Sequence, residues 1–144
     1  MPPLTLKDAQ ELIRLALSFA RENSLAPLAV AVLDARASVK ALAAEDGVPI
    51  GWSDIAIGKA RGALIMGVDS RVLGQQAVER PHFFAGVNHA VGGVLVPVAG
   101  GVLIHLNAVI AGAVRIAGDA SDRDEAAAKA AISAVFAPTR LRSA

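Results

Sequence analysis

Residues 100–118 read GGVLIHLNAVIAGAVRIAG, and this stretch decides the fold. Val102–Leu106 and Val109–Ala117 are apolar and partly β-branched, which favours strands, and Asn107-Ala108 between them favours a tight turn. Glycines recur through the stretch and leave one side of the hairpin bare, which suits close approach by a ligand or by another backbone. The stretch therefore predicts an antiparallel β-hairpin.

The segments on both sides of this hairpin extend the pattern. Ser121 is a typical helix cap, and the acidic residues that follow it favour a helix from Asp122 to about Phe136. On the other side, the apolar run Val94–Val98 predicts a further strand, joined to the hairpin through a turn at Ala99-Gly100-Gly101. Three consecutive antiparallel strands and a helix are thus expected in this half of the chain.

The first half of the chain predicts helices around one more hairpin. Thr5 with Asp8 three residues later is a capping-box start, and apolar residues repeat at helical spacing to about Asn23. Glu79–Gly93, which contains Pro81 and several glycines, is expected to be a long irregular loop. The remaining expected elements are strands at 28–33 and 38–44 and helices at 53–66 and 70–78.

These elements predict an α/β (α+β) fold. The order α-β-β-α-α-β-β-β-α, with strands joined by hairpins, implies one five-stranded antiparallel sheet flanked by helices on both sides. With 144 residues, the chain is expected to be a single domain over 1–144. Residues 1–4 and 138–144 are expected to be flexible tails.

Composition excludes several classes of function. Apolar residues make up 54% and charged residues 19%, which indicates a folded domain that buries further surface in a homo-oligomer. An aromatic share of 3% and a net charge of +1 argue against nucleic acid as a partner. With no cysteine, disulfides, thiolate metal sites and a cysteine nucleophile are excluded. The N-terminus does not resemble a signal peptide and no apolar run is long enough for a membrane, so a cytoplasmic protein is expected.

Several segments, in their order and spacing, carry a family resemblance. The chain resembles the GlcG/HbpS-like, or haem-degrading domain (DUF336-type), family, which includes the C-terminal domain of some propanediol-utilisation corrinoid adenosyltransferases. The resemblance covers roughly Leu4 to Ala134. It rests on Leu4-Thr-Leu-Lys-Asp-Ala9, Ala29-Val-Ala-Val-Leu-Asp34, Ala56-Ile-Gly-Lys-Ala60, Gly100-Gly-Val-Leu-Ile104, Gly112-Ala-Val-Arg-Ile-Ala-Gly118 and Asp124-Glu125.

The resemblance implies a profilin-like α-β-α domain that assembles into homo-oligomers. For some members it also implies binding of haem or a link to cobalamin metabolism, so haem is the cofactor to expect. The chain departs from the family pattern at two places. Asp34-Ala-Arg-Ala-Ser38 lacks the usual Gly-Gly-His after the first strand, and Arg115 and Asp119 replace small residues near the end of the last one. These changes indicate a ligand unlike that of a typical member.

Three histidines are candidates for iron ligation or proton transfer. A haem needs an axial donor, and imidazole is a common one, so His82, His89 and His105 are the axial candidates. Phe83 and Phe84 beside His82 would form a porphyrin wall. Each histidine has an ordinary alternative, as a loop residue or, for His105, as a residue at a subunit contact. Their spacing does not predict a preformed metal site.

Two cations and two glycines complete the candidate ligand site. Arg115 stands among apolar residues, so it is either solvated or buried and paired, with Asp34, Asp54 or Asp119 as partners. A buried guanidinium binds carboxylates bidentately, as in a small organic acid or a haem propionate. Lys59 is a second candidate ligand for an anion, or a structural cation. Gly100 and Gly101 present backbone N–H groups to an anion or serve the turn.

The sequence leaves three functions open. The first is a small-molecule-binding protein for haem or a related tetrapyrrole. The second is an enzyme acting on an anionic organic substrate, with His89 or His105 as acid and base and Arg115 as the anchor. The third is a non-catalytic accessory subunit of an oligomer. Which ligand is bound, and whether the chain is an enzyme, stay open at this level.

Overall fold

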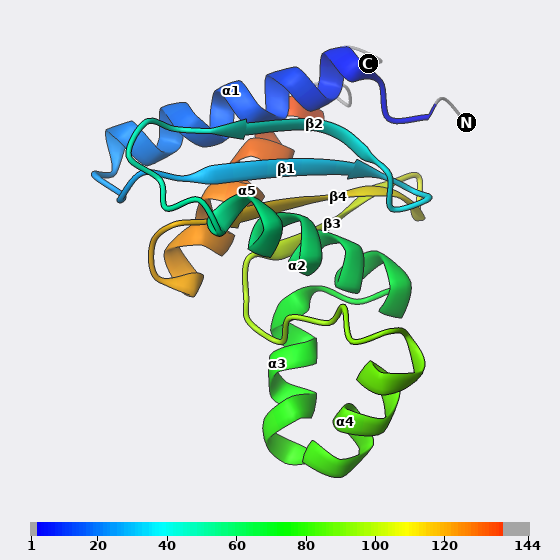
Figure 1. The fold of residues 1–144 in the computed structure, drawn as a ribbon. Coiled ribbons are helices and arrows are strands. Elements are labelled where there is room, and N and C mark those ends of the chain that lie inside the picture. The colour runs from blue at the N-terminus through cyan, green and yellow to red at the C-terminus, as the bar shows by residue number, and fades with distance from the viewer. Residues whose placement is uncertain (1–2, 137–144) are drawn as a thin grey trace.

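The computed structural model describes residues 3–136, which form five helices and a four-stranded antiparallel sheet in the order β2-β1-β4-β3 (Figure 1). The helices are α1 (Leu6–Glu22), α2 (Trp52–Met66), α3 (Ser70–Glu79), α4 (Pro81–Ala90) and α5 (Ser121–Phe136). The strands are β1 (Ala29–Asp34), β2 (Val39–Ala44), β3 (Gly101–Leu106) and β4 (Val109–Ala117). Both expected hairpins, β1-β2 and β3-β4, are confirmed.

Helices cover both faces of the sheet, as expected. α1 and α5 pack together on one face, and α2 packs on β1, β3 and β4 from the other face. The α3-α4 hairpin lies beyond α2 and extends away from the sheet (Figure 1). The domain therefore consists of a three-layer body and a helical hairpin that projects from it.

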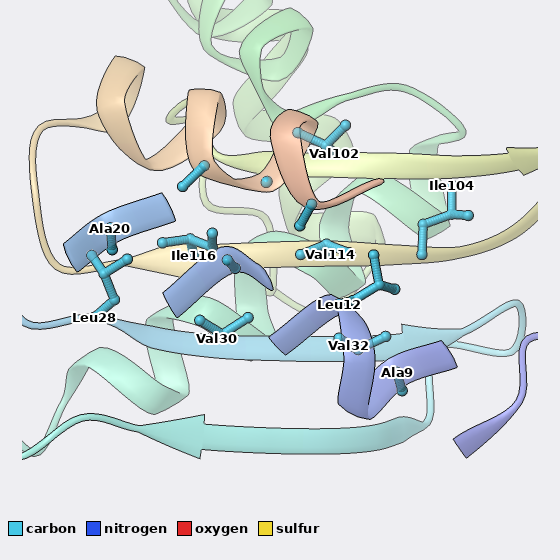
Figure 2. Close-up of a cluster of buried hydrophobic side chains, with 14 of the residues drawn as sticks. Ala9, Leu12, Ala20, Leu28, Val30, Val32, Val102, Ile104, Val114 and Ile116 are labelled. Atoms are coloured by element: carbon cyan, nitrogen blue, oxygen red, sulfur yellow. The ribbon is translucent and has the colours of Figure 1, made fainter. Parts of the chain in front are cut away.

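The two sides of the sheet are packed differently. Toward α1 and α5, branched side chains such as Val30, Val32 and Ile116 interdigitate with Leu12 (Figure 2). Toward α2, the strands and the helix meet mainly through alanines, listed here: Ala29, Ala31, Ala56, Ala60, Ala63, Ala113 and Ala117. β1 is apolar at every position except its last residue. Because successive strand residues point to opposite faces, this pattern shows that both faces of β1 are buried.

The start of α1 follows the expected capping box. The Asp8 backbone N–H donates to the Thr5 hydroxyl at 3.0 Å, and the Asp8 carboxylate accepts from the Thr5 N–H at 3.2 Å. Two backbone donors that the helix leaves unpaired are thus satisfied. Leu4, expected in a flexible tail, instead lies buried in the core beside this cap. Residues 138–144, expected to form the other tail, lie outside the described residues.

The expected fifth strand is wrong: Val94–Val98 is not part of the sheet. This segment instead runs along the helices, because glycines make room for it. A Cβ on Gly62 would lie 3.2 Å from Leu95, and a Cβ on Gly74 would lie 2.9 Å from the Pro97 carbonyl oxygen. The apolar residues of Val94–Val98 therefore pack against α2 and α3 instead of forming a strand. In addition, Pro97 lacks the backbone N–H that a strand ladder requires.

The loop expected over Glu79–Gly93 is also wrong, because most of it forms α4. Pro81 occupies the first turn, where a proline is well tolerated. No residue of α4 is fully buried, and its half-buried side, made of Phe84, Val87 and Asn88, is too short to stand out as a helical apolar pattern. No helix among residues 3–136 is long and apolar enough to cross a membrane.

Candidate functional site

Arg115 is a fully buried cation on a central strand, with 0% of its surface exposed. Its neighbours across the sheet are small: β4 pairs it with Ala31 of β1 and Gly101 of β3. Its Nη1 donates to the Ala99 carbonyl oxygen at 2.6 Å, whereas Nε and Nη2 have no hydrogen-bond partner among the described residues. Burial lowers the pKa of Arg115 to about 9, although the nearby carboxylates of Asp124 and Glu125 act to raise it. The protein thus holds a charged group whose hydrogen bonds are incomplete.

None of the expected partners of Arg115 pairs with it. The Asp34 carboxylate accepts from backbone N–H groups of its own turn, and Asp119 accepts from the Ala26 and Ala120 N–H groups. No ion pair joins Asp54 to Arg115 either, within residues 3–136. Of the two alternatives for Arg115, the side chain is buried rather than solvated, and none of the three possible partners forms an ion pair with it among residues 3–136.

Gly100 and Gly101 make room for Arg115 and for the helices. A Cβ on Gly100 would overlap the Arg115 guanidinium, and the φ of +120° at Gly100 is a conformation that favours glycine. A Cβ on Gly101 would lie 2.9 Å from the Lys59 carbonyl oxygen and 3.0 Å from Ser70 Oγ. The bare side of this turn is therefore occupied by the protein itself.

An ion-pair network lies at the first turn of α5. The Glu125 carboxylate accepts from Arg71 Nε at 3.0 Å and from Lys129 Nζ at 3.0 Å, and Arg71 also pairs with Asp122. The hydrogen bonds from Arg71 and Lys129 hold the pKa of Glu125 below its usual value, despite its burial. The network fixes α3 to α5 and stands close enough to Arg115 to act on its charge.

Asp124, next to this network, carries a pH-dependent contribution to stability. It is 1% exposed, and its Oδ1 accepts from the Asp119 N–H at 3.0 Å. Burial raises the pKa of Asp124 from 3.8 to about 6, against the lowering effect of that hydrogen bond and of Arg115. Because the pKa of Asp124 is higher in the folded than in the unfolded protein, protonation of Asp124 stabilises the fold. This contribution to the free energy of unfolding is full below about pH 4 and is lost as the pH rises through 6.

Replacing Asp124 by asparagine removes this titration while keeping a carbonyl oxygen for the Asp119 N–H. The free energy of unfolding of Asp124→Asn, measured relative to the wild type, is expected to rise by about 1–2 kcal/mol between pH 4 and pH 7. Urea denaturation at a series of pH values measures this difference. A difference that stays constant across that range would contradict the raised pKa.

A cleft of about 400 Å³ lies between α3 and the segment 97–99. Its polar lining comes from Arg71, Gln75 and Glu79, and its apolar lining includes Val78. Ala99 is both a wall of the cleft and the acceptor for Arg115 Nη1. The cleft is therefore separated from the buried guanidinium by the chain at residues 99–100.

Two of the candidate histidines share one face of α4. His82, Ala85, Gly86 and His89 follow the spacing i, i+3, i+4, i+7, and all four are exposed. A Cβ on Gly86 would meet nothing within 4 Å, so the space over the middle of this face is open. The two histidines are about 10 Å apart along the helix axis, and only Ala85 and Gly86 lie between them on this face.

The two phenylalanines of α4 are placed differently. Phe83 is 47% exposed, and the Arg80 guanidinium lies 4.1 Å from its ring centroid. Phe84 is half-buried. Because neighbouring helix residues project about 100° apart, the two rings do not form one wall. Phe83 is the more exposed of the two rings, and it lies at the edge of the face that carries His82.

The remaining candidates lie elsewhere. His105 is exposed on β3, opposite Ile110, whereas Arg115 lies opposite Gly101 at the other end of that strand. Lys59 is buried on α2, with its carbonyl next to Gly101. The structure thus does not bring His105 to Arg115, and it places His89 on the projecting hairpin.

Sequence reasoning missed the residues that hold the start of β3. Ser70 Oγ accepts from the Gly101 N–H at 2.7 Å, and Asp69 Oδ1 accepts from the Leu103 N–H at 2.8 Å. Both residues begin α3, where a serine or aspartate ordinarily indicates a helix cap. Their true partners are more than 30 positions away, so no local pattern reveals them.

Comparison with solved structures supports the fold. Klebsiella pneumoniae protein ORFY, assigned to DUF336, superposes with a TM-score of 0.86 at 20% identity, covering 95% of this chain and 93% of that one. PduOC in complex with haem gives a TM-score of 0.84 at 23% identity, covering 94% and 96%. A double mutant of Streptomyces reticuli HbpS gives 0.80 at 22% identity, covering 93% and 88%.

No curated protein matches the chain in sequence. The family model for haem-degrading HbpS-like proteins, however, matches residues 4–133, which is nearly the whole described domain. The expected resemblance is thereby confirmed, together with the haem-related character of the family. The chain belongs to the HbpS-like family of haem-degrading proteins.

Proposed function

We propose that this chain binds haem or a related tetrapyrrole on the exposed face of α4. The observation that carries the proposal is the placement of His82 and His89 at the two ends of a face whose middle residues, Ala85 and Gly86, are small. A flat macrocycle packs closely on a helix face only where side chains are short. The membership of the chain in the HbpS-like family and the haem complex of PduOC support the same ligand.

The donors on α4 suit the chemical groups of haem. His82 is an exposed imidazole, and haem, when bound, supplies an iron that takes such a nitrogen as an axial ligand. The exposed Phe83 ring, about 100° around the helix from His82, adds apolar surface at the edge of this face. Arg80 and the N-terminal end of α4 are positive and suit propionate carboxylates. For these reasons we assign His82, rather than His89, as the axial ligand.

A single copy of α4 offers one side of such a site. Val78, which is 82% exposed, and Phe83 add to the apolar surface of the projecting hairpin. Exposed apolar residues of this kind are typical of surfaces that another subunit covers. We therefore include in the proposal that a second copy of this chain covers the bound ligand, as the composition also suggests.

Titration with haemin, followed in the Soret band, tests this function. The wild type is expected to bind saturably, and His82→Ala to bind at least about tenfold more weakly because the axial bond is lost. His105→Ala is the matched control, since His105 lies in the sheet on a separate element. Light scattering with and without haemin reports whether the bound form contains more than one copy.

One outcome would contradict haem binding itself, and another would contradict only the choice of His82 as the ligand. Non-saturating binding that none of the variants alters would contradict the haem function. Loss of binding in His89→Ala with His82→Ala unchanged would move the axial ligand to the other end of α4. Both histidines are exposed, so circular dichroism is expected to show an unchanged fold in each variant.

A further inference from the structure

The two edges of the sheet are finished differently. β3 lies at one edge, where Ser70 Oγ accepts from the Gly101 N–H and Asp69 Oδ1 accepts from the Leu103 N–H. The start of α3 thus caps hydrogen-bond donors on the outer side of β3. β2 lies at the other edge, with β1 as its neighbour in the sheet and α1 and α2 packed on its two faces (Figure 1). The outer edge of β2 has no such cap among residues 3–136.

The hydrogen bonds at the end of β2 show which of its backbone groups are free. The Glu45 N–H donates to the Leu28 carbonyl oxygen at 2.9 Å, and the register between β1 and β2 is regular at this end. In an antiparallel ladder, alternate residues turn their N–H and C=O groups toward the same neighbour. Ala43 therefore faces β1, as Glu45 does, whereas Leu42 and Ala44 direct their backbone groups outward.

We propose that β2 pairs antiparallel with β2 of a second copy of this chain, which joins two four-stranded sheets into one across a two-fold axis. The axis passes beside Ala43, so Leu42 and Ala44 of one copy exchange backbone hydrogen bonds with Ala44 and Leu42 of the other. The α3-α4 hairpin, which carries the proposed haem surface, contacts the sheet at β3, the opposite edge. This interface is therefore separate from that surface and does not rest on the proposed function.

The side chains of β2 suit this partner. Leu42 is 43% exposed and Val39 is 44% exposed in a single copy. In the pairing, Leu42 lies opposite Ala44 of the second copy, which covers part of it, and Ala43 lies opposite Ala43. The alanines are small, so the two backbones meet without a steric barrier. Pairing thus removes unpaired backbone groups and an apolar side chain from water together.

Charges at the two ends of β2 favour the same register. Lys40 and Asp46 are both exposed, and neither forms a salt bridge with another described residue. Each lies three positions from Ala43, so the pairing places Lys40 of each copy opposite Asp46 of the other. A lysine on an edge strand ordinarily opposes pairing, but here the two lysines lie at opposite ends of the interface. The bulge of β2 at Lys40 lies outside the exchanged pairs of Leu42 and Ala44.

A disulfide tests the interface, because the chain has no cysteine and one introduced cysteine can bridge only two copies. Facing residues between exchanged pairs have Cα atoms about 4.5 Å apart, within the range of about 4.4–6.8 Å that a disulfide spans. Ala43→Cys, prepared without haemin and mildly oxidised, is therefore expected to form a linked dimer on a non-reducing gel. Ala41→Cys is the matched control: it is also half-buried on β2 but lies roughly 13 Å from its counterpart, so linkage is expected to be at least about tenfold slower.

Exchanging the end charges tests the register. Sedimentation equilibrium without haemin measures the Kd of the dimer. Lys40→Asp and Asp46→Lys are each expected to raise this Kd at least about tenfold, because both symmetric pairs become repulsive, and the double variant is expected to return to within about threefold of the wild type. Lys7→Asp, which makes the same change of charge on the exposed side of α1, is expected to dimerise as the wild type does.

Three results would overturn the proposal. The first is a wild type that stays monomeric; if it dimerises only after removal of residues 137–144, the edge belongs to that segment instead. The second is equal cross-linking of Ala43→Cys and Ala41→Cys. The third is a Kd that the single charge variants leave unchanged. Circular dichroism of each variant is expected to match the wild type, because all of these changes lie at exposed or half-buried positions.

Discussion

Replacing Arg115 by methionine is expected to raise the free energy of unfolding at pH 7 by about 2 kcal/mol. The wild type buries a guanidinium that makes one hydrogen bond and leaves two nitrogens without an acceptor among residues 3–136. Burial lowers the pKa of Arg115 to about 9 even with Asp124 and Glu125 nearby, so the charged form is less stable in the folded protein than in water. Methionine fills similar space without the charge.

Urea denaturation measures this effect as a higher midpoint with an unchanged slope. Arg61→Met serves as the control, and its stability is expected to stay within about 0.5 kcal/mol of the wild type because Arg61 is only half-buried. A less stable Arg115→Met would mean that the bond to Ala99 and the attraction to the carboxylates outweigh the cost of burial. Greater stability after the loss of a buried charge would show that this arginine costs folding free energy, as groups that serve a function often do.

The substitution Gly112→Ala is expected to destabilise the protein by about 3 kcal/mol or more. Gly112 pairs with Asp34 between the two central strands, and a Cβ there would overlap the Leu33 carbonyl oxygen. That oxygen belongs to the backbone of β1 and moves only if the ladder between β1 and β4 is disturbed. The added methyl would also lie 3.1 Å from Leu4, so the core offers no space on that side.

Gly86→Ala is the control for this substitution. Gly86 lies in exposed α4 with nothing within 4 Å of an added Cβ, so alanine is expected to stabilise by about 0.5–1 kcal/mol through helix propensity. The two variants, compared by urea denaturation, separate steric overlap from the general effect of replacing glycine. A loss below about 1 kcal/mol in Gly112→Ala would show that the strands separate easily at this point.

Local signals explain which parts of the fold were predicted from the sequence. The hairpin of β3 and β4 was found because its apolar runs and its turn are contiguous, and the start of α1 because Thr5 and Asp8 cap it locally. α4 is not evident from the sequence because its half-buried side is short and holds only two apolar residues, Phe84 and Val87. Val94–Val98 resembles a strand because an extended chain packed on helices has the same apolar pattern.

The candidate site was predicted in its residues but not in its arrangement. Arg115 was recognised as a cation among apolar neighbours, but its unused hydrogen bonds depend on contacts made by Ala99 and Gly100 in three dimensions. The pairing of Arg71 with Glu125 joins residues 54 positions apart, which one sequence does not reveal. His82 and His89 are seven residues apart, which places them on the same face only if the segment is a helix. A loop over Glu79–Gly93 does not predict that arrangement.

The contact between Gly100 and Arg115 also bears on how sequences of this family change. A side chain at position 100 and a long side chain at position 115 exclude each other, because they would occupy the same space. The order of substitutions therefore matters: a side chain at position 100 fits only after the arginine is shortened, and the φ of +120° there still disfavours residues other than glycine. Once arginine is present at position 115, position 100 can only remain glycine. The residues at these two positions, 15 apart in the sequence, are therefore expected to change together.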